Sequence, residues 1–157
     1  GVIGLGTSGT LIARALKFFK AEVSYFSRTR KPELENEYGF IYKDLNTLCK
    51  DSEAIFLALN KNVFLLQKEQ FDLMNGKRIL FNTSIGPGFN VEALKEWLKD
   101  ENHFFFGDTL NTAGDHSIWK KKNTFTINKS SGGKTYQAYL RLGEKVLNNI
   151  YEYLNKN

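Results

Sequence analysis

Three glycines near the start of the chain have the spacing of a turn that brings phosphate groups against the backbone. The segment Gly4-Leu5-Gly6-Thr7-Ser8-Gly9 follows an apolar run and precedes a helical pattern. In such a turn the first glycine makes the sharp change of direction, the second lets a pyrophosphate approach, and the third allows close helix–strand packing. The free N–H groups of the helix then face the phosphates. We therefore expect Gly4, Gly6, Thr7, Ser8 and Gly9 to bind a dinucleotide; the alternative is an ordinary strand-to-helix turn.

A second candidate group lies about 20 residues beyond the glycines, where an acidic residue would hydrogen-bond the adenosine ribose of NAD. This chain instead has Ser27, Arg28, Thr29 and Arg30, followed by Lys31. Cations and hydroxyl groups suit an adenosine 2′-phosphate, which a carboxylate would repel. The sequence therefore favours NADP over NAD, with residues 27–30 at the adenosine ribose. An exposed basic loop that serves only solubility is the alternative.

Composition limits the classes of protein to which the chain can belong. Its 157 residues are 41% apolar and 25% charged, which is typical of one globular domain. We see no apolar run of membrane-spanning length and no signal peptide, and we expect no membrane partner. The one cysteine, Cys49, excludes an internal disulfide and fits a reducing, cytoplasmic compartment. Its helix-like surroundings favour a buried structural thiol.

The net charge of +5 raises the question of nucleic-acid binding. The basic clusters lie at residues 28–31 and 120–122. No helix-turn-helix, zinc-ligand or RNA-binding aromatic pattern accompanies them, so we expect solvated surface and no nucleic acid as a partner.

Strand and helix patterns alternate along the chain after the first apolar run. We expect strands at 22–27, 39–42, 54–59, 78–83, 104–106 and 124–127, and helices at 10–20, 32–37, 45–50, 63–74, 91–99 and from about 134 to 154. Residues 108–122 form a long polar connection of a kind that is often functional or disordered. This order predicts an α/β fold with a Rossmann-type, doubly wound parallel sheet in three layers, spanning residues 1–157.

The order of motifs resembles the NAD(P)-binding domain of the D-isomer-specific 2-hydroxyacid dehydrogenases. The resemblance covers essentially the whole chain. It is carried by the glycine turn, the apolar strand, the segment Phe71-Asp72-Leu73-Met74-Asn75-Gly76-Lys77, the strand ending Phe81-Asn82-Thr83-Ser84, the helix start Val91-Glu92-Ala93-Leu94, Asp108, and Lys134-Thr135-Tyr136-Gln137-Ala138.

This resemblance implies further contacts with the cofactor, NADP or NAD. Leu59, Asn60, Thr83, Ser84 and Asp108 would flank the ribose and nicotinamide, with Asp108 bonding the carboxamide. A helix-capping or loop aspartate is the alternative for Asp108. The resemblance also implies a homodimer and a small 2-keto or 2-hydroxy acid as substrate.

The chain departs from the family where the chemistry of keto-acid reduction is done. That reaction needs a cation for the substrate carboxylate, a proton donor, and a carboxylate that tunes the donor. Ile85 stands where the family has its arginine, Asn128 where it has its histidine, and Ala113 where it has the acid, although Asp115 is nearby. Of the two histidines, His103 precedes a strand and His116 lies in the long connection, where a solvated histidine is expected. We therefore assign no catalytic residue and no metal ligand.

The family also has a separate substrate domain, which is absent from this chain, so we expect the chain alone to be inactive. The leading hypothesis is the dinucleotide-binding domain of an oxidoreductase related to these dehydrogenases. A catalytically inactive module that binds or senses NAD(P) is the second. A reductase of another Rossmann family is the third, and nucleic-acid binding, which depends on charge alone, is the last.

Overall fold

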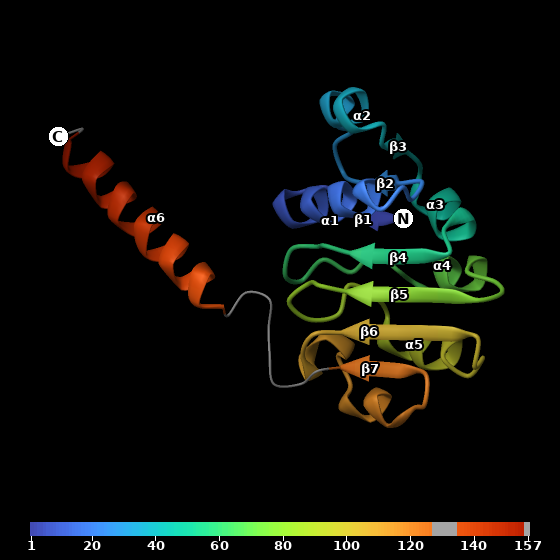
Figure 1. Cartoon of the computed structure of the whole chain (residues 1–157). Coiled ribbons are helices and arrows are strands. Elements are labelled where there is room, and N and C mark those ends of the chain that lie inside the picture. Colours follow the sequence, from blue (N-terminus) through green and yellow to red (C-terminus); the bar gives the residue numbers. More distant parts are fainter. Residues whose placement is uncertain (127–134, 156–157) are drawn as a thin grey trace.

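A computed structural model describes residues 1–126 and 135–155 of the chain (Figure 1). The strands are β1 (Val2–Ile3), β2 (Ser24–Phe26), β3 (Ile41–Tyr42), β4 (Ala54–Leu57), β5 (Arg78–Asn82), β6 (His103–Gly107) and β7 (Thr124–Thr126). The helices are α1 (Thr7–Phe18), α2 (Pro32–Tyr38), α3 (Leu45–Asp51), α4 (Lys68–Leu73), α5 (Val91–Trp97) and α6 (Tyr136–Asn155), with 3-10 helices η1 (Leu110–Ala113) and η2 (His116–Lys120).

The strands form one sheet in the order β3-β2-β1-β4-β5-β6-β7, and every neighbouring pair is parallel. Successive strand residues point to opposite faces, so the sheet has a core on each side. Val2 belongs to a smaller core with residues of α1 and α2, and its neighbour Ile3 to a larger core with residues of α3, α4 and α5. The predicted doubly wound, three-layered α/β fold is confirmed.

The buried thiol expected at Cys49 is confirmed on α3. Cys49 is fully buried in the larger core. Burial raises the pKa of this thiol to about 12, so it stays protonated and packs as a small apolar side chain.

The helix predicted at 63–74 is wrong in its first five residues. Leu66 instead forms a parallel bridge with Phe89, and the backbone N–H groups of Leu65 and Leu66 donate to the carbonyl of Gly88. The helix begins only at Lys68, because Gln67 and Gln70 form a capping box there. Hydrogen bonding to the distant residues Gly88 and Phe89 therefore keeps Leu65 and Leu66 out of the helix that their pattern predicted.

The connection at 108–122 is more ordered than its polar composition predicted. It contains η1 and η2, and Ile118 is fully buried. The ring of Trp119 stacks on Phe105 of β6 at 5.3 Å between centroids. A few apolar residues thus fasten the connection to the larger core.

Asn82, the last residue of β5, ties together the loops that follow β5 and β6. Its side chain is 1% exposed, and its amide donates to the carbonyls of Gly86 and Thr112, at 2.9 Å each. Its carbonyl oxygen accepts from the N–H of Ser84 at 3.0 Å. Three hydrogen bonds from one buried amide therefore fix the loop geometry at this edge of the sheet.

The last helix, α6, differs from the others in having no contact with either core. None of its described residues is buried, and Figure 1 shows it apart from the sheet. Two residues predicted to belong to elements at this end, Ile127 and Lys134, lie outside the described residues. Within the described ranges, no helix combines the length and the apolar character needed to cross a bilayer.

We predict that Asn82→Ala lowers the free energy of unfolding by about 1–3 kcal/mol, because it leaves buried polar groups without partners. Urea denaturation monitored by tryptophan fluorescence measures this change. The matched control is Asn75→Ala, since Asn75 is exposed and its amide donates only to nearby carbonyls. Equal stability of the two variants would contradict the role given to Asn82.

Candidate functional site

The residues expected to bind a cofactor follow five neighbouring strands. In a parallel sheet the carboxyl ends of all strands lie along one edge, toward which the arrowheads of β4 to β7 point in Figure 1. The glycine turn follows β1, residues 27–30 follow β2, residues 59–60 follow β4, residues 83–84 follow β5, and Asp108 follows β6. The connections from β1 run toward β2, whereas those from β4 run toward β5. Ligands bind such sheets at this change of direction.

The glycine turn between β1 and α1 has a different geometry at each of its three glycines. Gly4 has φ of +95°, and a Cβ there would lie 2.5 Å from the carbonyl oxygen of Ala58. A Cβ on Gly9 would collide with the carbonyl oxygen of Gly4. Gly6 is exposed, and a Cβ there would meet no atom within 4 Å. Gly4 and Gly9 are therefore required by the fold, whereas space lies open beside Gly6.

That open space lies at the start of α1. Gly6 is the N-cap residue, and no side chain caps the helix. The first intrahelical bond runs from the N–H of Thr10 to the carbonyl of Gly6, at 2.9 Å. The preceding N–H groups, of Thr7, Ser8 and Gly9, belong to a helix start that is suited to hold an anion.

The basic loop after β2 is only partly available to a ligand. Arg30 donates two hydrogen bonds to the carboxylate of Glu35, at 2.8 and 2.7 Å, and lies over the ring of Tyr42. The hydroxyl of Tyr25 donates to the same carboxylate at 2.7 Å. Arg28, by contrast, is exposed and forms no ion pair within the described part of the chain.

The electrostatics of this loop follow from these contacts. Hydrogen bonds from Arg30 first, and from Tyr25 second, lower the pKa of Glu35 to about 2. Burial first, and the bond to Glu35 second, raise the pKa of Tyr25 to about 12. Near neutral pH, Glu35 is therefore charged and neutralises Arg30.

The other two residues of this loop are Ser27 and Thr29. The Ser27 hydroxyl donates to the carbonyl of Thr29 at 2.6 Å, which closes the loop on itself. Thr29 is exposed.

The hydroxyl groups after β5 make bonds that join β5 to β4. Thr83 Oγ1 donates to the carbonyl of Leu57 at 2.7 Å. Ser84 is buried, and its Oγ accepts from the N–H of Leu59 at 2.9 Å. The hydroxyl proton of Ser84 is not used in that bond. These side chains hold the two strand ends together in the structure.

Asn60 and Asp108 lie at the same edge with fewer constraints. Asn60 is exposed after β4, and Asp108 is half-buried directly after β6. Ile85, where the family arginine was expected, is 75% exposed in the loop after β5. A hydrocarbon side chain there offers no charge to a substrate carboxylate.

The residues near the expected acid and histidine have structural partners. Asp115 forms a 2.7 Å ion pair with Lys95 and caps η2 by accepting from the N–H of Ser117. The bond from Lys95 first, and the bonds from Ser117 next, hold its pKa well below the usual range. Ala113 is fully buried, and Asn128 lies outside the described residues.

Each of the two histidines also contacts a neighbouring side chain or carbonyl group. His116 is exposed, with Nε2 3.3 Å from the side-chain oxygen of Asn111. His103 is buried, stacks on Trp97 at 4.2 Å, and its Nδ1 donates to the Trp97 carbonyl at 2.7 Å. Across the described ranges no group of three or more His, Cys, Asp or Glu side chains could hold a metal ion.

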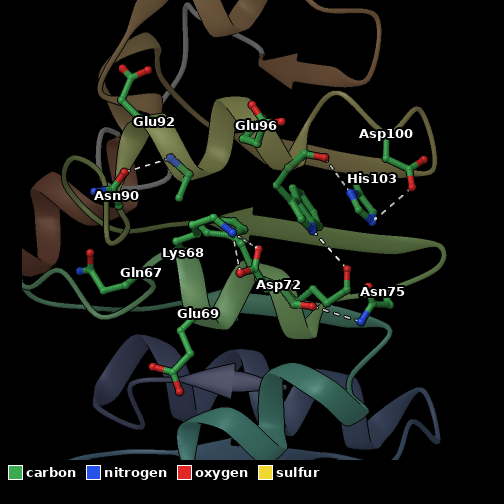
Figure 2. A pocket seen from close by; sticks show the side chains of 14 residues that line it. Gln67, Lys68, Glu69, Asp72, Asn75, Asn90, Glu92, Glu96, Asp100 and His103 are labelled. Carbon is green, nitrogen blue, oxygen red and sulfur yellow. Dashed lines mark hydrogen bonds and ion pairs between the residues drawn. The ribbon is translucent and has the colours of Figure 1, made fainter.

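A groove of about 730 Å³ lies away from this edge, between α4 and α5 (Figure 2). Its rim is acidic, but lysines offset much of that charge, as in the pair Lys68–Asp72, at 2.6 Å. His103 Nε2 has no hydrogen-bond partner and lies 3.9 Å from Asp100 Oδ2. None of the residues expected to bind cofactor lines this groove.

Three residues that fix the geometry of the site, Glu35, Tyr25 and Asn82, were not predicted from the sequence. Glu35 and Tyr25 decide which arginine of the basic loop is available, and Asn82 fixes the loops after β5 and β6. Glu35 lies five residues after Arg30, just inside the helix that starts at Pro32, so charge complementarity was the available signal. No pattern indicated Tyr25, which looked like an ordinary strand residue.

Comparison with known families agrees with the geometry of this edge. Residues 1–127 match the family model described as D-isomer specific 2-hydroxyacid dehydrogenase, NAD binding domain. The chain belongs to this family. The resemblance predicted from the motifs is thereby confirmed for the NAD-binding domain.

Curated relatives of this dehydrogenase family include two glyoxylate reductases. The protein of Thermococcus litoralis is 32% identical over 158 residues, covering 96% of this chain and 47% of the relative. That of Pyrococcus furiosus is 27% identical, covering 96% of this chain and 46% of the relative. The chain thus spans about half the length of the curated relatives it matches.

Solved structures of similar chains have the same fold. Apo D-lactate dehydrogenase from Escherichia coli is 25% identical, with a TM-score of 0.79 over 100% of this chain and 51% of its own. An acyclic imino acid reductase in complex with NADPH and D-Arg is 25% identical, with a TM-score of 0.85 over 99% of this chain and 50% of its own.

We predict that the Glu35 carboxyl titrates near pH 2 and that Arg30→Met raises its pKa toward the usual 4.5. Because the pKa is lower in the folded state, the stability contributed by this group is complete above about pH 4.5 and is lost as the pH falls through about 2. Carbon-detected NMR of the side-chain carboxyl measures the titration. Lys68→Met is the matched control, since it removes a cation from a different ion pair. A Glu35 pKa that does not change in Arg30→Met would contradict the assignment.

Proposed function

We propose that this chain binds a nicotinamide dinucleotide along the carboxyl edge of its sheet, with the pyrophosphate at the start of α1. The observation that carries the proposal is the open backbone at Gly6 beside an uncapped twelve-residue helix, held in place by Gly4 and Gly9. Backbone N–H groups and the helix dipole favour an anion there. The adenosine ribose then lies at residues 27–30, beside β2.

The other residues at this edge belong to the nicotinamide half of the proposed site. By family resemblance, Leu59, Asn60, Thr83, Ser84 and Asp108 flank the second ribose and the nicotinamide. The bonds from Thr83 and Ser84 to β4 favour a positioning role, with the Ser84 hydroxyl proton left to donate to a ligand. When bound, the reduced dinucleotide would supply a hydride for a 2-keto acid, and the chain's own residues would hold the dinucleotide in place.

We further propose that the adenosine end prefers NADP, with Arg28 as the main cation for the 2′-phosphate. Arg28 is exposed and unpaired among the described residues, whereas Glu35 neutralises Arg30. A free guanidinium and the exposed hydroxyl group of Thr29 suit a phosphate, whereas the hydroxyl of Ser27 would first have to leave the Thr29 carbonyl. The family resemblance adds a small 2-keto or 2-hydroxy acid as substrate, and a homodimer; both stay predictions.

A second candidate function is a module that binds NAD(P) without catalysis. Ile85 favours it, because this exposed side chain cannot bind a carboxylate where the family has an arginine. Incubation with NADPH or NADH and several 2-keto acids, including glyoxylate, tests the two candidates. Oxidation of the cofactor by the chain supports an oxidoreductase. Because we expect the chain alone to be inactive without a substrate domain, cofactor binding with no turnover supports the binding module only when it is found in a protein that includes such a domain.

The glycine turn gives the sharpest test of dinucleotide binding. We predict that Gly6→Ala leaves the melting temperature unchanged, because the added methyl group meets no atom. The same variant should weaken the binding of NADPH at least about tenfold, or 1.4 kcal/mol. Gly9→Ala should instead lower the melting temperature, since its methyl group collides with the Gly4 carbonyl. Thermal unfolding and fluorescence titration with NADPH and NADH measure both effects. A Gly6→Ala chain that binds as tightly as the original would exclude the pyrophosphate from this turn.

Cofactor preference is tested by the basic loop. We predict that Arg28→Ala weakens the binding of NADPH by about 1.5–3 kcal/mol, which is the contribution of a hydrogen bond to a charged group. The binding of NADH should not change. Arg30→Ala should weaken NADPH binding less, and Glu35→Gln should strengthen NADPH binding because it frees Arg30. The control is Lys122→Ala, which removes an exposed positive charge beside β7. Equal loss of NADPH and NADH in Arg28→Ala would rule out a role for Arg28 in phosphate recognition.

A further inference from the structure

The groove between α4 and α5 combines an apolar floor with acidic walls (Figure 2). Its apolar lining consists of Phe71, Met74, Ala93 and Trp97, which all belong to the larger core. Its volume of about 730 Å³ lies within the range of small-molecule sites, which is roughly 300–1,000 Å³. A ligand with an apolar body and charged ends would suit such a groove.

The charge of the groove is opposite in sign to that of the chain. Five carboxylates and one lysine line the groove, whereas the chain has a net charge of +5. Three of these carboxylates have a lysine partner, in the pairs Asp72–Lys68, Glu92–Lys95 and Glu96–Lys99. The other two, Glu69 and Asp100, have no lysine or arginine partner in the described part of the chain. Figure 2 shows them on opposite sides of the lining side chains.

A buried nitrogen without a partner lies beside one of these two carboxylates. His103 lines the groove and is only 7% exposed. Its Nδ1 lies 2.7 Å from the Trp97 carbonyl, which can only accept, so Nδ1 carries the proton and the neutral ring has a lone pair at Nε2. Among the described residues no donor reaches Nε2.

His103 Nε2 and Asp100 Oδ2 therefore form a pair of acceptors that lacks a donor. They are 3.9 Å apart, which is too far for a hydrogen bond between them. An ammonium nitrogen at about 2.8 Å from each atom can bridge such a gap. The Asp100 side chain is 48% exposed, so it can turn outward to admit the ligand.

We propose that this groove binds an aliphatic polyamine. One ammonium group bridges Asp100 and His103, a second binds Glu69, and the methylene chain lies over the rings of Phe71 and Trp97. An ammonium group has three donors and no acceptor, which suits a site made of acceptors, and its hydrocarbon stem packs well on apolar surface. The faces of aromatic rings also attract cations.

A small cation fits this charge pattern better than a broad basic surface of another protein does. The three lysines that pair with the other carboxylates would repel such a surface, and they confine the attraction to two points. The proposal is independent of dinucleotide binding, because none of the residues expected to bind cofactor lines the groove.

Calorimetric titration of the full 157-residue chain with spermidine tests the proposal. We expect saturable binding of one spermidine per chain, at least about tenfold tighter than binding of butylamine, which has one ammonium group. Asp100→Asn and Glu69→Gln should each weaken spermidine about tenfold. Both amides keep an oxygen for the bonds that these side chains accept from Asn102 and Asn46, so the fold should not change.

The matched control is Glu101→Gln, which removes the same charge one residue beyond Asp100. Glu101 is exposed and does not line the groove, so this variant should bind spermidine like the original chain. Spermidine should also shift the NMR signal of the Trp97 indole N–H, which donates to the Met74 carbonyl beside the groove.

Three results would overturn the proposal. If Glu101→Gln weakens spermidine as much as Asp100→Asn, the attraction is general and no site exists. Equal affinity for butylamine and spermidine would exclude a ligand that joins two points. Binding of an oligolysine peptide without binding of spermidine would assign the groove to a protein partner.

Discussion

The parallel pairing of β1 with both β2 and β4 is the interaction on which the rest of the structure depends. Val2 is the register partner of Tyr25 on one side and of Phe56 on the other. This pairing joins the two halves of a sheet whose seven strands all have their carboxyl ends on one edge, and it makes β1 and β4 the point where the connections diverge. It also explains the glycines, because α1 can return against β1 and β4 only if Gly4 and Gly9 have no side chain.

The same parallel pairing imposes a demand on both faces of the sheet. Over β1 and β2, α1 and α2 cover one face, and Tyr25 is fully buried beneath them. Over β4 to β6, α3, α4 and α5 cover the other face, which leaves an apolar row of register partners on the opposite face, Phe56, Phe81, Phe106 and Phe125. Its register is as regular as that of the buried face. A regular, apolar, in-register row is what a strand presents to a packing partner.

Much of this architecture could be predicted from the sequence, because the signals were local. The glycine spacing, the apolar run at 54–59 and the alternation of strand and helix patterns each depend on neighbouring residues. The errors occurred where distant residues decide. Leu66 pairs with Phe89, and Ile118 and Trp119 bind a polar connection to the core. In the basic loop, Glu35 neutralises Arg30 from five residues away, and only the fold brings the Tyr25 hydroxyl of β2 against the same carboxylate.

Binding and chemistry are separable in a site built this way. The proposed pyrophosphate site, at the start of α1, is made of backbone N–H groups beside glycines that have no side chain. Its geometry therefore does not depend on which residue occupies position 85. Ile85 lies on a different loop, after β5, and makes no contribution to the turn after β1. Under the proposed alignment of Ile85 with the family arginine, the proposed dinucleotide site would therefore not depend on the charge that orients a keto acid. The Gly6→Ala titration tests the first property, and turnover by a protein that binds the cofactor tests the second.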